Sequence, residues 1–321
     1  MCEGFYEWNR LVDCRALLHQ IGKSMSTTHT PGLFVPHRIM QDRLFMADGQ
    51  VQLAHESVDE AIEAAAKLSE LNWLLFLRAF KIQIYLWEGS VAQAKKEIIL
   101  LHIPKNDMPT YSRELEYITL VRLLSKQHKY SEALRLLERL KPQSARECQL
   151  SSIVEISILQ ALIEHQRGQK SAALRYIHEA LIIGEANGYV RSFLDEGSMM
   201  AELLQLYVQH RSHTIHSSEL KEVSATYVRK LIGLFTQKKE MNAPSPASAL
   251  VEPITPSELN MLYLIRDGAS NKQIAEELAL SEGTVRVYLS RIYAKLGVTP
   301  AVRPGMQHKS CSCCGKNKIR K

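Results

Sequence analysis

A small residue recurs about every 40 positions in the first part of this sequence, and this period restricts the fold more than any other feature. The alanines of the repeat are 40, 39 and 40 residues apart. A small side chain lets one helix approach another closely, and a period of this length is typical of stacked repeats. Four segments carry it: GQVQLA (49–54), GSVAQA (89–94), KYSEAL (129–134) and QKSAAL (169–174), with Ala54, Ala94, Ala133 and Ala173 aligned.

The sequence between the repeated alanines has the spacing of amphipathic helices. Apolar residues recur three and four positions apart, as in the segment from Ala133 to Leu140, and no stretch of residues 1–240 alternates with a period of two. The fold class expected is therefore all-α, with a tetratricopeptide-like helical solenoid over residues 1–240 and units slightly longer than the usual 34 residues. An irregular helical bundle that happens to carry alanines is the alternative.

Composition divides the rest of the chain into three parts. The stretch MNAPSPASALVEP (241–253) contains three prolines, which forbid a continuous helix, and we interpret it as a linker. Residues 254–298 then have helical spacing and form a second, small domain. Residues 299–321 make an irregular, basic, cysteine-rich tail after Val298.

The net positive charge of the chain comes entirely from that tail. The net charge is +6, and residues 301–321 contain six basic residues and no acid, so the remainder has 34 basic and 34 acidic side chains. A general polyanion-binding surface is not indicated, and affinity for DNA would depend on local placement of charge. No run of about 18 apolar residues and no signal-peptide pattern is present, so we expect a cytoplasmic protein without a membrane span.

The second domain contains start and stop signals for three short helices. Pro256 suits the first helical position, where its missing N–H has no cost, and Gly268 suits the left-handed residue that ends a helix. Ser270 and Ser281 are each placed to cap a following helix by accepting a hydrogen bond from a free backbone N–H. A tight turn separates the second helix from the third.

The third helix, residues 281–296, has one apolar stripe and one polar face. Val285, Leu289, Ile292 and Leu296 form the stripe, at i, i+4, i+7 and i+11. A scaffold helix, a tight turn and a second helix with a basic outer face fit insertion into the major groove of DNA. The residues outside the stripe are Arg286, Val287, Ser290, Arg291, Ala294 and Lys295.

This domain resembles the LuxR-type helix-turn-helix family. SNKQIAEELALSEGTVRVYLSRIYAKLGV matches the family pattern SNKEIAxxLxLSxxTVKxHxxxIxxKLGV almost position for position. The resemblance implies that Arg286 and Val287 reach base edges, on a guanine and a thymine methyl, with Ser290 and Arg291 on the next turn. It also implies contacts with phosphates, which fix register without reading sequence, from Asn271, Lys272, Ser281 and Thr284.

Some of these positions have a second interpretation, and some depart from the family pattern. Val287 and Ser290 are equally well explained as ordinary surface residues, and Lys295, a further candidate DNA contact, as a charge that favours the helix dipole. Ser257 stands where the family usually has arginine, and Tyr288 replaces a common histidine, a mild change. After Val298 the fourth helix of the family is missing, which indicates either a divergent native tail or a frameshift.

The first part of the chain resembles, more loosely, the sensor array of MalT-like regulators, the large ATP-binding members of the LuxR family. GYVRSFLDEGSMMAELL (188–204) and YVRKLIGLF (227–235) carry that resemblance. The chain would correspond to the C-terminal part of such a regulator without its nucleotide-binding module. Gly22-Lys23-Ser24 ends no phosphate loop, because Leu17 stands where the first glycine is needed and the preceding residues are helical. No cofactor is expected.

The leading hypothesis is a transcriptional regulator that binds double-stranded DNA, with an array that senses a small-molecule inducer or a partner protein. A homodimer on DNA and RNA polymerase are further candidate partners. The alternative is an interaction scaffold whose DNA-binding domain has decayed. No metal site is expected, since the C-x-C-C spacing in the tail (His308, Cys311, Cys313 and Cys314) is not a common finger spacing. No constellation supports an enzyme.

Overall fold

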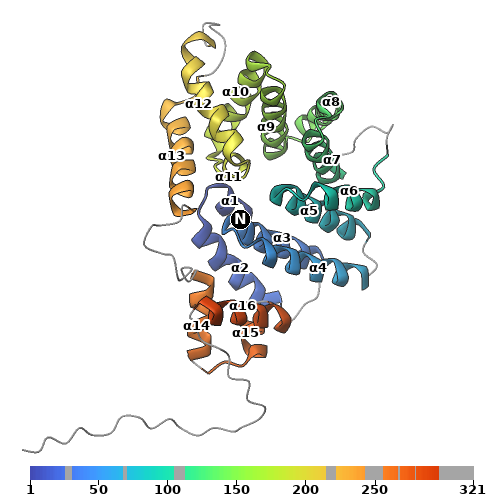
Figure 1. The fold of residues 1–321 in the computed structure, drawn as a ribbon, viewed down its shortest axis with the longest axis vertical. Coiled ribbons are helices and arrows are strands. Elements are labelled where there is room, and N and C mark those ends of the chain that lie inside the picture. The colour runs from blue at the N-terminus through green and yellow to red at the C-terminus, as the bar shows by residue number, and fades with distance from the viewer. Residues whose placement is uncertain are drawn as a thin grey trace, which may run out of the picture.

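The computed structural model describes residues 1–25, 31–67, 71–104, 113–214, 222–242, 256–266, 268–278 and 280–295. Every regular element in these ranges is helical, which confirms the all-α prediction (Figure 1). The array contains α1 (Cys2–Glu7), α2 (Leu11–Met25), α3 (Pro31–Ala47), α4 (Val51–Lys67), α5 (Leu71–Glu88), α6 (Val91–Glu97), the 3-10 helix η1 (Ile98–Leu101), α7 (Glu114–Lys126), α8 (Tyr130–Arg146), α9 (Leu150–Gln166), α10 (Lys170–Asn187), α11 (Arg191–Leu194), α12 (Ser198–Thr214) and α13 (Ala225–Asn242). The C-terminal helices are α14 (Pro256–Arg266), α15 (Asn271–Leu278) and α16 (Glu282–Lys295).

The 40-residue period of the sequence is a period of helix pairs. The four aligned alanines each occupy the fourth position of the second helix in a pair, namely α4, α6, α8 and α10, and none is exposed to solvent. Each of these helices packs on the helix before it, while α3, α5, α7 and α9 also pack on one another in order. A solenoid of stacked pairs has this pattern of contacts, so the predicted repeat architecture is confirmed.

The array curls until its first helix meets a segment more than 180 residues further along the chain (Figure 1). The backbone N–H of Val190 donates to the carbonyl oxygen of Glu7 at 2.7 Å. The Glu7 carboxylate accepts hydrogen bonds from the backbone N–H and the hydroxyl of Ser192, at 3.1 and 2.7 Å. The Tyr6 hydroxyl donates to Asp195 at 2.9 Å. Segment 188–204 therefore ties the far end of the array to its beginning.

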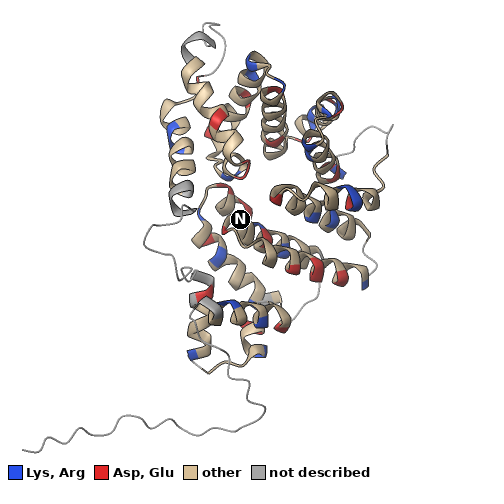
Figure 2. Cartoon of the chain, in the orientation of Figure 1, with Lys and Arg blue, Asp and Glu red and all other residues tan. Residues whose placement is uncertain are grey.

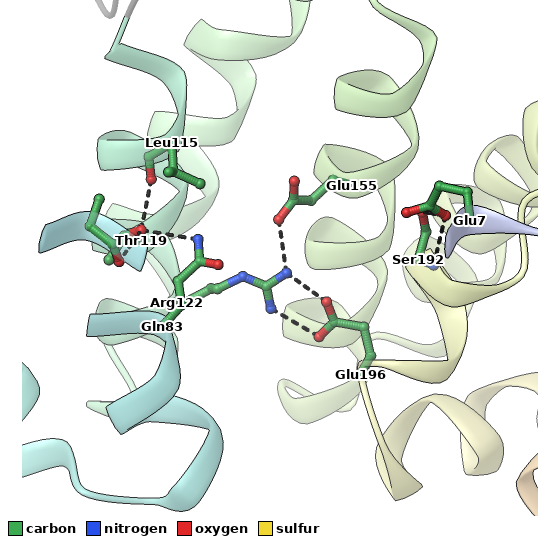
Figure 3. Close-up of polar contacts among 9 residues, drawn as sticks. Glu7, Gln83, Leu115, Thr119, Arg122, Glu155, Ser192 and Glu196 are labelled. Carbon is green, nitrogen blue, oxygen red and sulfur yellow. Dashed lines mark hydrogen bonds and ion pairs between the residues drawn. The ribbon is translucent and has the colours of Figure 1, made fainter. Parts of the chain in front are cut away.

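A second link across the array is the guanidinium group of Arg122 on α7 (Figure 3). It donates to Glu155 on α9 at 2.9 Å and to both carboxylate oxygens of Glu196, at 2.6 and 3.0 Å, in the turn between α11 and α12. Burial works against the charged form of Arg122, but the two carboxylates more than offset it and raise its pKa. One side chain thus joins α7, α9 and the turn between α11 and α12.

The boundary between the array and the linker lies slightly later than the sequence predicts. Met241 and Asn242 belong to α13, so the first two residues assigned to the linker are helical. The remainder of that stretch, 243–253, and the tail 299–321 with its cysteines lie outside the described residues.

None of the described helices is long and apolar enough to cross a membrane. Over the same residues, no three His, Cys, Asp or Glu side chains gather as a metal site would require.

Candidate nucleic-acid interface

Helices α14, α15 and α16 pack on one another as a compact three-helix unit. Pro256 is the first residue of α14, and Gly268, with φ of 83°, follows that helix in the left-handed conformation. Both positions are as predicted, since proline lacks the N–H that would go unpaired there and glycine has no Cβ to oppose a positive φ.

Side-chain caps set the start of α15 and of α16. The Ser270 hydroxyl accepts a hydrogen bond from the backbone N–H of Gln273 at 3.3 Å, and the Gln273 side chain accepts one from the N–H of Ser270 at 2.8 Å. This reciprocal pair is a capping box. The Ser281 hydroxyl accepts from the backbone N–H of Thr284 at 3.0 Å. Both predicted caps are confirmed, and they fix where the second and third helices begin.

The outer face of α16 is separated from its buried stripe as the spacing predicts. Val285, Leu289 and Ile292 are buried, whereas Leu296 lies outside the described residues. The Arg286 side chain is 69% exposed, and one of its guanidinium nitrogens lies 3.6 Å from a carboxylate oxygen of Glu282 on the preceding turn. The exposed residues of this face are Arg286, Val287, Ser290 and Arg291. Because residues four apart are neighbours on a helix, these four make one continuous surface.

The residues predicted to contact phosphates fall into two groups. Asn271 and Lys272 are exposed in the first turn of α15, and Ser281 is half-buried beside the start of α16. Thr284 is different, because only 3% of it is exposed and its hydroxyl donates to a carboxylate oxygen of Glu60 on α4 at 2.9 Å. The side chain of Lys295 lies outside the described residues.

Glu60 belongs to a contact surface between the array and the C-terminal helices, which we call the seam. It joins α2, α3 and α4 to α14, α15 and α16. Phe45 and Tyr288 pack with ring centroids 6.3 Å apart, and Tyr288 is 2% exposed. Burial, with a smaller contribution from Asp48, raises the pKa of the Tyr288 hydroxyl. The Tyr288 ring, which looked like a mild departure from the family, is thus a buried part of the seam.

An ion pair lies at the edge of the seam. The Lys23 ammonium group is 2.9 Å from the Glu277 carboxylate, and this hydrogen bond lowers the pKa of Glu277. Lys23 lies in the last turn of α2, a continuous helix through the Gly-Lys-Ser triplet. Sequence reasoning missed the seam because its partners are more than 220 positions apart, and the one signal for it was an aromatic residue at position 288.

Comparisons with known proteins also divide the chain into a helical array and a C-terminal helix-turn-helix domain. Residues 2–210 match the model of the MalT-like TPR region, and residues 252–303 match that of bacterial regulatory proteins of the luxR family. The chain is 23% identical over 300 residues to the HTH-type transcriptional regulator MalT of Vibrio parahaemolyticus, covering 91% of this chain and 33% of that protein. The MalT regulator of Cronobacter sakazakii is 27% identical over 279 residues, covering 78% of this chain and 29% of that protein.

A tetratricopeptide-like array joined to a helix-turn-helix domain defines the class of protein. The chain belongs to the family with a MalT-like TPR region, and it carries a LuxR-family DNA-binding domain. It spans about a third of the length of the curated relatives that it matches. These relatives are transcriptional regulators.

Proposed function

We propose that this chain is a transcriptional regulator that inserts α16 into the major groove of double-stranded DNA. The observation that carries the proposal is the open face of α16, on which two arginines, a valine and a serine are exposed together. Helix α16 has 14 residues and is therefore about 21 Å long at 1.5 Å per residue, enough to lie in a groove. The Ser281 cap holds its first turn, which in helix-turn-helix proteins lies nearest the bases.

The side chains of this face have separate roles in the proposal. Arg286 hydrogen-bonds the acceptor edge of a guanine, and Val287 packs on a thymine methyl group. Ser290 and Arg291 extend the same surface by one turn. The remaining contacts are to phosphates and position the domain without reading sequence: Asn271, Lys272, Ser281 and Thr284, with Lys295 at the end of the helix.

The proposal assigns control of DNA binding to the array. A small-molecule inducer or a partner protein that binds the array would act on α16 through the seam, because the two parts of the chain are in direct contact there. Binding to DNA as a homodimer, contact with RNA polymerase and a location in the cytoplasm belong to the same proposal. Sedimentation of the chain with and without DNA tests the dimer.

The test is fluorescence anisotropy with labelled promoter fragments at one fixed salt concentration, because phosphate contacts make affinity salt-dependent. We expect Arg286→Ala to weaken binding to the preferred fragment about 5- to 100-fold, the cost of one lost base contact, and to change binding to unrelated DNA much less. The matched control is Arg135→Ala on α8, an exposed arginine of the array. Absence of binding to every fragment, or an Arg286→Ala variant that binds like the control, would contradict the proposal.

A further inference from the structure

The hydroxyl group of Thr284 has two incompatible uses. In the proposed function, on which this inference rests, it contacts a DNA phosphate. In the structure it donates instead to the Glu60 carboxylate at 2.9 Å. A carboxylate oxygen and a phosphate oxygen are both anionic acceptors at the same hydrogen-bond distance. Glu60 therefore stands where the proposed phosphate oxygen would be.

The helix that carries Glu60 is acidic. It has four acids and one lysine, the acids being Glu56, Asp59, Glu60 and Glu63. Figure 2 shows acidic positions, in red, along α4, and α4 contacts α16. Asp59 and Glu60 each contact a basic residue of the array, Lys81 at 2.6 Å and Arg38 at 3.4 Å, so their charge is partly balanced. A duplex that approached Thr284 closely would still meet both the bulk and the negative field of α4.

The seam is incompletely closed at two places. In its ion pair, the Lys23 and Glu277 side chains are each about half exposed, and exposed ion pairs contribute little to stability. A half-open pocket of about 300 Å³ lies between the two parts, lined among others by Leu44, Asn260 and Tyr288. The pocket is therefore an unfilled part of a contact that otherwise buries apolar residues of both parts, among them Val58 and Val285.

We propose that the acidic face of α4 is an internal competitor of DNA, with Glu60 holding Thr284 in a closed state of the regulator. The closed state leaves the base-reading face of α16 exposed and blocks the backbone contact at its first turn. DNA and α4 then exclude each other, and the measured affinity is the intrinsic affinity reduced by the fraction of molecules in which the seam is open. An inducer or partner protein that separates α4 from α16 therefore activates DNA binding.

The experiment compares Glu60→Gln with Glu63→Gln in the full chain. Both changes remove one negative charge from α4, and Glu63 is exposed about one turn further along. A general gain in attraction for DNA is therefore common to the two variants. Glu60→Gln alone replaces the charged acceptor of Thr284 with a neutral one, so we expect it to bind DNA about three- to tenfold more tightly than Glu63→Gln, the difference between a hydrogen bond to a charged acceptor and one to a neutral acceptor.

Amide hydrogen exchange gives a second readout. Competition is reciprocal, so DNA that protects α16 must raise exchange in the seam-facing parts of α2 and α4. Tight DNA binding by both variants without a difference between them, or without that rise in exchange, would overturn the competition while the proposed function stands. Absence of DNA binding in the wild type and in both variants would overturn the proposed function itself, and the competition with it.

Discussion

Asp42 on α3 is the most strongly perturbed carboxyl group among the buried residues described. No part of the residue is exposed, and burial raises its pKa from 3.8 to about 8, against the opposing effects of the Ser57 hydroxyl and of Arg38. Glu60 acts in the same direction as burial. The folded protein therefore keeps this proton over a pH range in which the unfolded chain has lost it.

That difference predicts a pH dependence of stability. Between about pH 4 and pH 8 the folded state holds one proton more than the unfolded state at this site, so its contribution to stability falls as pH rises and is lost above the folded pKa. Asn is a neutral isostere. The gain in the free energy of unfolding from Asp42→Asn should therefore be larger at pH 8 than at pH 5, by up to roughly 4 kcal/mol at about 1.36 kcal/mol per pH unit.

Urea unfolding at the two pH values measures this effect, with Asp59→Asn as the control. Asp59 lies on α4 with its side chain 49% exposed and paired with Lys81, so its replacement should give a small change. A difference between wild type and Asp42→Asn that is the same at pH 5 and pH 8 would show that this carboxyl group is not protonated in the folded protein.

At the scale of the element, each helix pair depends on one left-handed residue five positions before the repeated alanine. These residues are Gly49, Gly89, His128 and Gly168, with φ between 60° and 88°. The alanines, the capping serines and the apolar stripe of α16 could be predicted from the sequence because each depends on neighbours within one or two turns. The left-handed residue of the third pair could not be predicted in this way, because it is a histidine and not a glycine.

The same substitution should have opposite effects at two glycines of the array. A Cβ added at Gly168 or at Gly233 meets nothing within 4 Å, so packing does not distinguish them. Gly168 has φ of 77°, where Cβ is strained, and we expect Gly168→Ala to lower the free energy of unfolding by about 1 kcal/mol. Gly233 lies inside α13, and Gly233→Ala should raise it by about 0.5–1 kcal/mol. Thermal and urea unfolding of the two variants measure the signs; two shifts in the same direction would refute the argument.

At the scale of the whole molecule, contacts between distant segments decide the shape, and the spacing of apolar residues does not predict them. Tyr6 with Asp195, and Thr284 with Glu60, are pairs separated by 189 and 224 positions. A helical period records which face of a helix is buried, but it does not record which distant segment buries it. The solenoid was therefore predictable, whereas its closure through α1 and the seam against α4 were not.

The Arg122 cluster tests how much that closure contributes to stability. Arg122→Gln leaves the Glu155 and Glu196 carboxylates facing each other without the cation between them (Figure 3). Removing one partner of a buried pair typically costs 3–5 kcal/mol, and because the Arg122 side chain is 23% exposed we expect a loss of about 2–4 kcal/mol. The matched control is Arg135→Gln, an exposed arginine whose loss should change the free energy of unfolding by less than about 0.5 kcal/mol.

A second substitution distinguishes loss of the cluster from general damage to α7. In the double variant Arg122→Gln/Glu196→Gln one of the two unpaired charges is gone, so part of the lost stability should return, and the double-mutant cycle should show a coupling energy of at least about 1 kcal/mol. Amide exchange should also rise in segment 188–204 in the single variant, because Arg122 holds the turn that carries Glu196. Additive effects with unchanged exchange would mean that the array stays closed without this cluster, through the contacts of α1 alone.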